Sequence, residues 1–330
     1  MKRRSFLKGA GSAAATLQVL GCSVMSGGYR PAGVVPRTKL GKTGIEVSRL
    51  GFGSHLESSL IKKPRRRDRI IKMGFEGGIN TFDVYDHGGY KQFEPMSKSL
   101  RDIRKEVIIS LYAVNPTDKL QDEIDGALKT FRTDYIDLYR INRVDDDRIS
   151  ILEKSKKAGK IRAIGVVSHD ATSMTGYVED YRDILDFVMI VYNFHHNIGR
   201  FTRKIDLPND YSALIPMCEQ IGLGILGIKP MGSDDMTAFA STKGFFNDKK
   251  ANLAQAMLRH IYRRTEIDCV MPAMNSMHEL SENLESIYNP VSSPDEKELL
   301  ERLSAHASST RGAYLRPHYR WLENWSTRTV

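Results

Sequence analysis

Eight short apolar runs, separated by amphipathic stretches, constrain the fold of this chain more than any other feature. The stretches between them place apolar side chains on one helical face, as at 118–131, 251–262 and 277–287. Alternating strands and helices indicate a parallel sheet. Eight such units favour a closed (β/α)8 barrel, the TIM barrel, over an open sheet of five or six strands. The predicted strands are residues 49–53, 79–83, 106–112, 135–141, 161–167, 186–192, 223–228 and 267–273.

The segments that flank these units predict two additions to the barrel. Residues 38–48 contain two short runs around a Lys-Thr-Gly turn, which predicts a β-hairpin closing the bottom of the barrel. An amphipathic helix is expected at 294–305, and the aromatic, basic tail at 310–325 is expected to pack over the barrel. The first strand is followed by "GFGSHLES", without the glycine pattern of a dinucleotide-binding Rossmann fold, which further favours the barrel.

Charge and cysteine content exclude several classes of protein. The net charge is +9, but four of the basic residues precede Gly21, in a stretch that has no acids. The short basic cluster within 62–69 is typical of a solvated loop and helix start, so no nucleic-acid partner is predicted. Three widely spaced cysteines give neither a disulfide framework nor a metal pattern. No internal apolar run is long enough to form a membrane-spanning helix.

The N-terminus has the pattern of an export signal. Residues 1–21 contain "RRSFLK" and a mildly apolar stretch, which resembles a twin-arginine signal peptide. The following "VLGC" resembles a lipoprotein cleavage site with Cys22 as the lipidated residue, although its leucine stands one place late; cleavage nearby is the alternative. Residues 22–36 then predict a flexible tether and 37–330 a single domain. We therefore expect a periplasmic protein or a lipoprotein that meets the membrane only through its signal or lipid anchor.

One stretch places chemically active side chains at a predicted strand end. "GINTFDVYDHGGYKQFE" (78–94) supplies an acid, tyrosines and a histidine around a glycine-rich turn. Together with "LGKTGIEVSRLGFG" (40–53), "TDYIDLYRI" (133–141), "GKIRAIGVVS" (159–168) and "ELSENL" (279–284), it resembles the aldo-keto reductases in order and spacing. This resemblance implies a barrel with NAD(P)H extended across its C-terminal mouth. It also implies reversible reduction of a carbonyl to an alcohol, on a small carbonyl or sugar-like substrate.

The resemblance also implies a catalytic aspartate and tyrosine. Asp83 matches the aspartate, but glycine stands at position 88, where the tyrosine is expected. If the loop carries two extra residues, Tyr90 becomes the proton donor, with Tyr85 and His87 as rivals. A proton donor of this kind needs a nearby cation to depress its pKa from an unperturbed value of about 10.

The cation and the histidine that the resemblance implies are both replaced. The third strand ends in Tyr112 where the lysine is expected, and Asn142 stands at the histidine position as a carbonyl-side hydrogen bonder. Lys229, at the end of the seventh strand, is a candidate for supplying the charge from another side. A surface or phosphate-facing role is the alternative for Lys229.

The resemblance implies a divergent cofactor site. Position 189 holds methionine in place of glutamine, and 169 holds histidine in place of asparagine. After the eighth strand, Ser276 and Glu279 stand where a basic residue binds the adenosine 2′-phosphate, so the sequence favours NAD over NADP, or weak binding. The predicted cofactor-binding residues are Ser168, His169, Met189, Ser276, Glu282 and Asn283.

Two other functions remain open at this point. The same barrel could serve as a non-catalytic ligand-binding or interaction protein. A metal-dependent enzyme is a third possibility, because several side chains could meet at the mouth: His55, Asp83, His87, His169, His195 and His196. Their spacing is not that of a known ligand set, so we predict no metal. Pocket specificity lies in the loops after the strands, which leaves the substrate and the oligomeric state open.

Overall fold

The computed structural model describes residues 33–53, 60, 62–87, 90–112, 116–194, 211–232, 240 and 243–309. In this part of the chain, seven parallel strands form one sheet, in the order β11-β10-β9-β8-β7-β6-β3. Their bounds are β3 (Thr81–Val84), β6 (Ile108–Tyr112), β7 (Ile136–Ile141), β8 (Ile161–Ser168), β9 (Phe187–Val191), β10 (Gly224–Ile228) and β11 (Cys269–Met271). A short antiparallel pair, β4 (Asp86–His87) and β5 (Tyr90–Lys91), follows β3.

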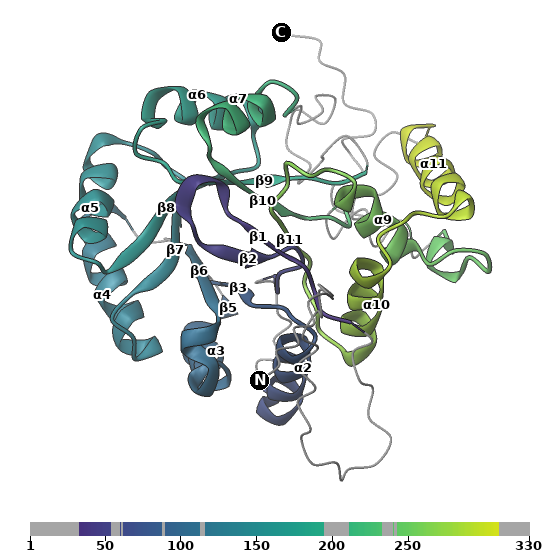
Figure 1. Cartoon of the computed structure of the whole chain (residues 1–330), viewed down its shortest axis with the longest axis horizontal. Helices are drawn as coiled ribbons and strands as arrows, with labels where there is room; N and C mark the ends of the chain where they lie inside the picture. The colour runs from purple at the N-terminus through teal and green to yellow at the C-terminus, as the bar shows by residue number, and fades with distance from the viewer. Residues whose placement is uncertain are drawn as a thin grey trace, which may run out of the picture. The chain divides into compact units, whose positions relative to one another are not determined.

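The segment 49–53 occupies the eighth position and closes the sheet into a barrel (Figure 1). Leu50 bridges Val270 of β11, and Phe52 bridges Phe82 of β3, both in the parallel sense. The Gly51 N–H donates to the Val270 carbonyl at 2.8 Å. The prediction of a (β/α)8 barrel is confirmed, and each predicted strand lies within a few residues of an observed one.

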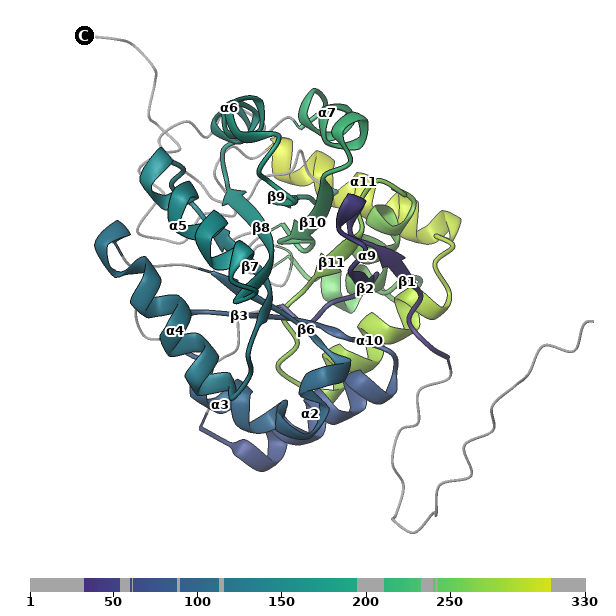
Figure 2. The same ribbon diagram turned by 60° about the vertical axis from the view of Figure 1, so that its left-hand side comes forward.

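Helices surround the barrel, and the predicted ones are confirmed (Figures 1 and 2). Side-chain oxygens of Asp145, Asp170, Asn252 and Ser276 cap the starts of four of them. The α-helices are α2 (Pro64–Glu76), α3 (Phe93–Ser99), α4 (Leu120–Phe131), α5 (Asp146–Lys157), α6 (Ala171–Tyr181), α7 (Leu214–Ile221), α9 (Leu253–Tyr262), α10 (Met277–Tyr288) and α11 (Pro294–Ser309). The short 3-10 helices are η1 (Gly41–Thr43), η2 (Arg101–Glu106), η3 (Thr117–Lys119) and η4 (Phe245–Asn247).

A β-hairpin plugs the end of the barrel where the strands begin, as predicted. Its strands β1 (Arg37–Lys39) and β2 (Glu46–Ser48) are antiparallel and lie across the barrel in Figure 1. The Lys42 N–H donates to the Gly222 carbonyl at 2.8 Å, just before β10. The buried side chains of the hairpin share one apolar cluster with residues that line the barrel, so the lower half of the barrel is a packed core. The cluster contains Leu40, Ile45, Val47, Ile108, Leu138, Ala163, Phe187, Met189, Leu226, Cys269 and Met271.

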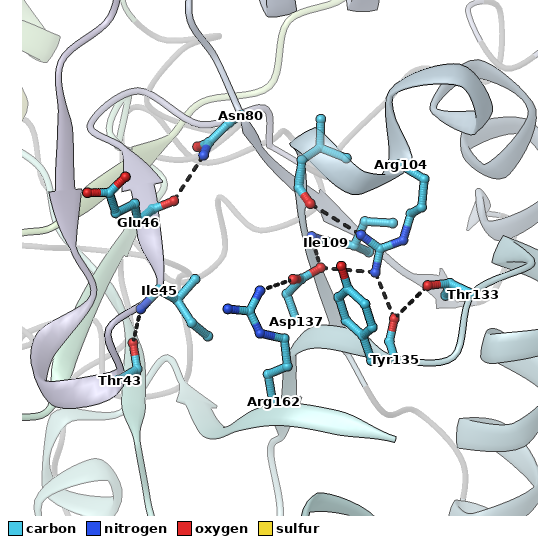
Figure 3. Close-up of polar contacts among 11 residues, drawn as sticks. Thr43, Ile45, Glu46, Asn80, Arg104, Ile109, Thr133, Tyr135, Asp137 and Arg162 are labelled. Atoms are coloured by element: carbon cyan, nitrogen blue, oxygen red, sulfur yellow. Dashed lines mark hydrogen bonds and ion pairs between the residues drawn. The ribbon is translucent and has the colours of Figure 1, made fainter. Parts of the chain in front are cut away.

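A buried carboxylate ties three strands together near the same end of the barrel (Figure 3). Asp137 Oδ2 accepts from the Ile109 N–H at 3.0 Å and lies 3.1 Å from Arg104 Nη2 of η2. Its Oδ1 accepts from Arg162 Nη1 of β8 at 2.6 Å. Both guanidinium groups also lie over the ring of Tyr135. The network satisfies the charges that this part of β7 buries.

The packing of the inner layer predicts the effect of one glycine substitution. A Cβ at Gly165 of β8 would lie 2.2 Å from the ring of the buried Phe187. We expect Gly165→Ala to lower the free energy of unfolding by about 1–3 kcal/mol, because the rigid ring cannot yield. Gly126→Ala in α4 is the matched control: its Cβ meets nothing within 4 Å, and it should stabilise the helix by about 0.5–1 kcal/mol. Urea denaturation measures both, and equal effects would contradict this account.

The ends of the domain are described only in part. Val35 is already buried, and its N–H donates to the Gly77 carbonyl at 2.9 Å, so the packed chain begins before β1. The predicted signal peptide, the lipidation site at Cys22, the tether up to residue 32 and the tail at 310–325 lie outside the described residues. In the described ranges, no helix combines the length and apolar character needed to cross a membrane.

Candidate active site

Three polar side chains form a buried layer inside the upper part of the barrel. Side chains alternate along a strand, so Arg140 points inward two residues after the inner-cluster residue Leu138. Asp83 and Ser110 face each other in the register of β3 and β6. Arg140 Nη1 lies 2.5 Å from Asp83 Oδ1 and donates to Ser110 Oγ at 2.7 Å, while Nη2 donates to Asp83 Oδ2 at 2.9 Å. Asp83 is 3% and Arg140 4% exposed, so the ion pair is almost fully withdrawn from water.

An aromatic layer lies next to this ion pair, toward the mouth. Tyr112 ends β6 and is registered with Arg140, whose Cζ lies 5.5 Å from the centroid of the Tyr112 ring. Tyr85 meets the same ring edge-on, with the centroids 6.3 Å apart. Burial raises the pKa of Tyr112 above its ordinary value, and the positive charge of Arg140 opposes that shift. The Tyr112 ring thus lies against the guanidinium that pairs with Asp83.

Arg140 was missed by the sequence-based prediction, which sought the cation at the end of the third strand or at Lys229. Its signal is visible in the printed sequence: an arginine stands inside the apolar run "YIDLYRI". A charged residue in a buried strand needs a partner, and Asp83 is such a partner two strands away, on β3.

The loop after β3 is a small hairpin held by a carboxylate. Asp86 Oδ1 accepts from the backbone N–H groups of Gln92, at 2.5 Å, and Phe93, at 2.9 Å, which holds the start of α3. The backbone of Tyr90 pairs with His87 across β4 and β5. The side chains of Tyr90 and His87 lie outside the described features, so their roles stay predictions.

The predicted residues on the other strand ends have different environments. Asn142, after β7, is exposed at the mouth, and so is His169, after β8. Ser168 is half-buried, and its Oγ accepts from the Asp170 N–H at 3.0 Å. Met189 has no exposed surface and belongs to the inner cluster below the mouth. Lys229 follows β10 in a left-handed conformation with φ 55°.

The start of α10 carries a capping box made by Ser276 and Glu279. Ser276 Oγ accepts from the Glu279 N–H at 3.1 Å, and Glu279 Oε2 accepts from the Asn275 N–H at 2.8 Å. A carboxylate therefore occupies the helix N-terminus, the position at which an anion would otherwise bind.

The two predicted adenine-side residues lie further along the same helix. Glu282 accepts a hydrogen bond from the Asn252 side chain and lies 3.4 Å from His278. Asn283 is buried, and its carbonyl accepts from Ser286 Oγ at 2.7 Å. Ser276, Glu282 and Asn283 thus lie at the start of α10 and along it, whereas Asp83 lies on β3 of the same barrel.

The candidate metal ligands are not brought together among the described residues. No group of three histidine, cysteine, aspartate or glutamate side chains there has an arrangement that could hold a metal ion. His55, His195 and His196 lie outside that part of the chain.

The fold is a (β/α)8 barrel with polar side chains near the C-terminal ends of its strands. Comparison with known proteins gives its family. The sequence model of the aldo/keto reductase family matches residues 49–304. The chain belongs to the aldo/keto reductase family, a family of oxidoreductases, as the sequence motifs predicted.

Individual relatives are distant. The chain is similar to a probable aldo-keto reductase 1 of Glycine max, 26% identical over 64% of this chain and 61% of that protein. It is also similar to the L-galactose dehydrogenase of Arabidopsis thaliana, 22% identical over 81% of this chain and 92% of that protein. The structure of aldo-keto reductase AKR11C1 from Bacillus halodurans, in its holo form, superimposes with a TM-score of 0.61 at 18% identity. That match covers 82% of this chain and 96% of the other, and it supports the fold.

Proposed function

We propose that this protein is a nicotinamide-dependent oxidoreductase that interconverts a carbonyl and an alcohol on a small polar, sugar-like substrate. The observation that carries the proposal is the buried Asp83–Arg140 pair beneath tyrosines at the barrel mouth. Carbonyl reduction creates negative charge on oxygen, and a fixed cation beside a proton donor stabilises that charge. Because Asp83 already holds the Arg140 cation in place, no side chain has to move when negative charge develops on the substrate oxygen.

The residues around the mouth fit the parts of a dinucleotide. Ser168 and His169 would hold the nicotinamide amide, and Glu282 and Asn283 would flank the adenine end. A bound reduced nicotinamide supplies the hydride for the reaction. Asn142, exposed at the end of β7, is placed to hydrogen-bond the substrate oxygen. The barrel floor below is closed by the hairpin and the inner apolar cluster, so the reacting groups meet at the rim.

The capping box of α10 favours NAD over NADP. The N–H groups of Asn275 and Glu279 already donate to Glu279 and Ser276, and the Glu279 carboxylate would repel a 2′-phosphate dianion. A 2′-hydroxyl can instead donate to a carboxylate oxygen. The local chemistry therefore suits the cofactor without the phosphate.

The likeness to an L-galactose dehydrogenase supports a sugar-like substrate, since that match covers 92% of the relative's length. We accordingly choose L-galactose with NAD as the oxidation probe and glyceraldehyde with NADH as the reduction probe. NADH binding is measured by nicotinamide fluorescence, and turnover by absorbance at 340 nm. Binding with turnover of either probe supports the proposal. A protein that binds neither NADH nor NADPH contradicts it and favours the non-catalytic ligand-binding alternative.

The cofactor preference gives a prediction that does not need the substrate. Glu279→Arg should tighten NADPH binding at least tenfold relative to NADH, because it replaces a repelling charge with an attracting one. The matched control is Glu285→Arg on the same helix, whose side chain bonds Asn289 away from the capping box. An unchanged ratio of the two dissociation constants in Glu279→Arg would show that the 2′ position of the cofactor lies elsewhere.

A further inference from the structure

We infer that Tyr112 is the catalytic proton donor of this barrel and that Arg140 is the cation that stabilises its phenolate. The inference deepens the proposed function and rests on it. The sequence-based prediction named Tyr90 as the donor and sought a lysine at the position that Tyr112 occupies. The geometry points to a rearranged set in which the tyrosine and the cation come from the neighbouring strands β6 and β7.

The guanidinium of Arg140 lies close to the ring of Tyr112. Arg140 Cζ lies 5.5 Å from the centre of the Tyr112 ring, within the range in which a cation is attracted to the face of an aromatic ring. Ionisation of Tyr112 spreads negative charge over that ring, so the attraction grows as the proton leaves. An opposite charge at such a distance lowers the pKa of an acid by about 1–3 units relative to the same site without it.

The Arg140 cation is held in one orientation. Two hydrogen bonds and an ion pair to Asp83 and Ser110 fix the guanidinium, and only about 4% of Arg140 is exposed. Arg140 therefore cannot reach a substrate itself and is a positioning residue. Tyr112 keeps partly exposed surface at the end of β6, so of these groups it is the one that can meet a carbonyl oxygen.

The charges around Tyr112 come from several elements. Arg140 on β7, Arg148 on α5 and Arg143 after β7 favour the phenolate, whereas Glu123 on α4 disfavours it. Glu123 accepts from the Tyr139 hydroxyl at 2.9 Å. Three cations against one carboxylate leave the immediate field positive, and the Asp83 carboxylate is held by Arg140. Burial opposes this field and keeps Tyr112 protonated at neutral pH, which is the form a donor needs.

Tyr112 and a bound nicotinamide together account for the proton and the hydride that the reaction transfers. In reduction, a bound reduced nicotinamide would supply a hydride to the carbonyl carbon and would itself be oxidised. The carbonyl oxygen takes the proton of Tyr112, and the Tyr112 O–H bond breaks. The phenolate held by Arg140 then regains a proton from water. In oxidation, the phenolate accepts the proton of the alcohol.

Tyr112→Phe tests the assignment, with turnover measured on the two probes and NADH binding measured by fluorescence. We expect kcat to fall at least a hundredfold while the NADH dissociation constant stays within about twofold, because a positioned acid contributes at least this factor. Tyr181→Phe is the control; its hydroxyl donates to Asp146 in an exposed contact between the outer helices α6 and α5. Tyr90→Phe is measured beside them, and a loss confined to Tyr90→Phe would overturn the assignment in favour of the sequence-based prediction.

The role of Arg140 has its own readout in the pH profile. The double variant Asp83→Asn/Arg140→Met keeps the shape of the buried layer and removes both charges. In the oxidation direction, we expect this double variant to raise the pH at which kcat rises by at least one unit. Arg140→Lys keeps the positive charge and should raise that pH by less. An unmoved profile would overturn the role of Arg140. A wild-type protein that binds NADH but turns over neither probe would overturn the assignment of Tyr112 as well, whereas loss of NADH binding would remove the proposed function itself.

Discussion

Arg140→Met should destabilise the protein by about 3–5 kcal/mol, because it leaves the Asp83 carboxylate charged, buried and unpaired. Removing one partner of a buried ion pair costs more than the pair contributes, since the remaining charge has lost both water and its counter-charge. Asp83→Asn alone should destabilise for the same reason, through Arg140. The double variant Asp83→Asn/Arg140→Met should recover most of the loss, because it buries no charge. Urea denaturation followed by far-ultraviolet circular dichroism measures all three.

The control for this cycle is an ion pair of the same type on the surface. Lys98 and Glu94 lie 2.6 Å apart on α3, and both side chains are more than half exposed. Glu94→Gln should leave the denaturation midpoint unchanged, because water already screens that pair. The sum of the two single losses at the buried pair should exceed the loss in the double variant by at least about 3 kcal/mol, which is the interaction energy of Asp83 and Arg140. If the single losses simply add in the double variant, Asp83 and Arg140 do not depend on each other for stability.

The architecture was predictable because its signals are local. The β strands are apolar runs, and helices such as α4 and α10 carry one apolar face each, so periodicity alone separates them. The capping residues Ser276 and Asp145 also stand at their helix starts in the sequence. The hairpin plug followed from its turn and its two short runs. The observed strands begin and end within a few residues of the predicted ones, and family motifs fixed their order.

The site was less predictable because it depends on register between strands. Whether Arg140 faces Asp83 depends on how β7 is shifted against β6 and β3, and nothing local in the sequence reports that shift. The motif resemblance directed attention to strand ends, whereas Arg140 lies one residue before the end of β7, within the barrel. The loss of the expected lysine was visible at Tyr112. Its replacement by a cation on the next strand became visible only with the fold.

Asp137→Asn should cost about 3 kcal/mol of unfolding free energy, comparable with the loss at Arg140 but with no direct effect on the mouth. The carboxylate is 1% exposed and binds Arg104, Arg162 and the Ile109 N–H (Figure 3). An amide keeps one acceptor but turns its NH2 group toward a guanidinium, which leaves the buried Arg104 without its counter-charge. Thermal and urea denaturation measure the loss, and NADH binding by the folded fraction should be unchanged because the network lies at the opposite end of the barrel.

Variants of the two arginines that bind Asp137 distinguish the effect of burial on stability from the effect of charge. Arg104 has 9% of its side chain exposed and also donates to the carbonyls of Val107 and Tyr135, whereas 42% of the Arg162 side chain is exposed. Arg104→Met should therefore destabilise the protein much more than Arg162→Met, although both remove one positive charge from the same carboxylate. Equal losses of stability in the two variants would mean that the net charge around Asp137 matters and the burial of the arginine does not. The loss expected for Arg140→Met, which depends on burial, would then be smaller.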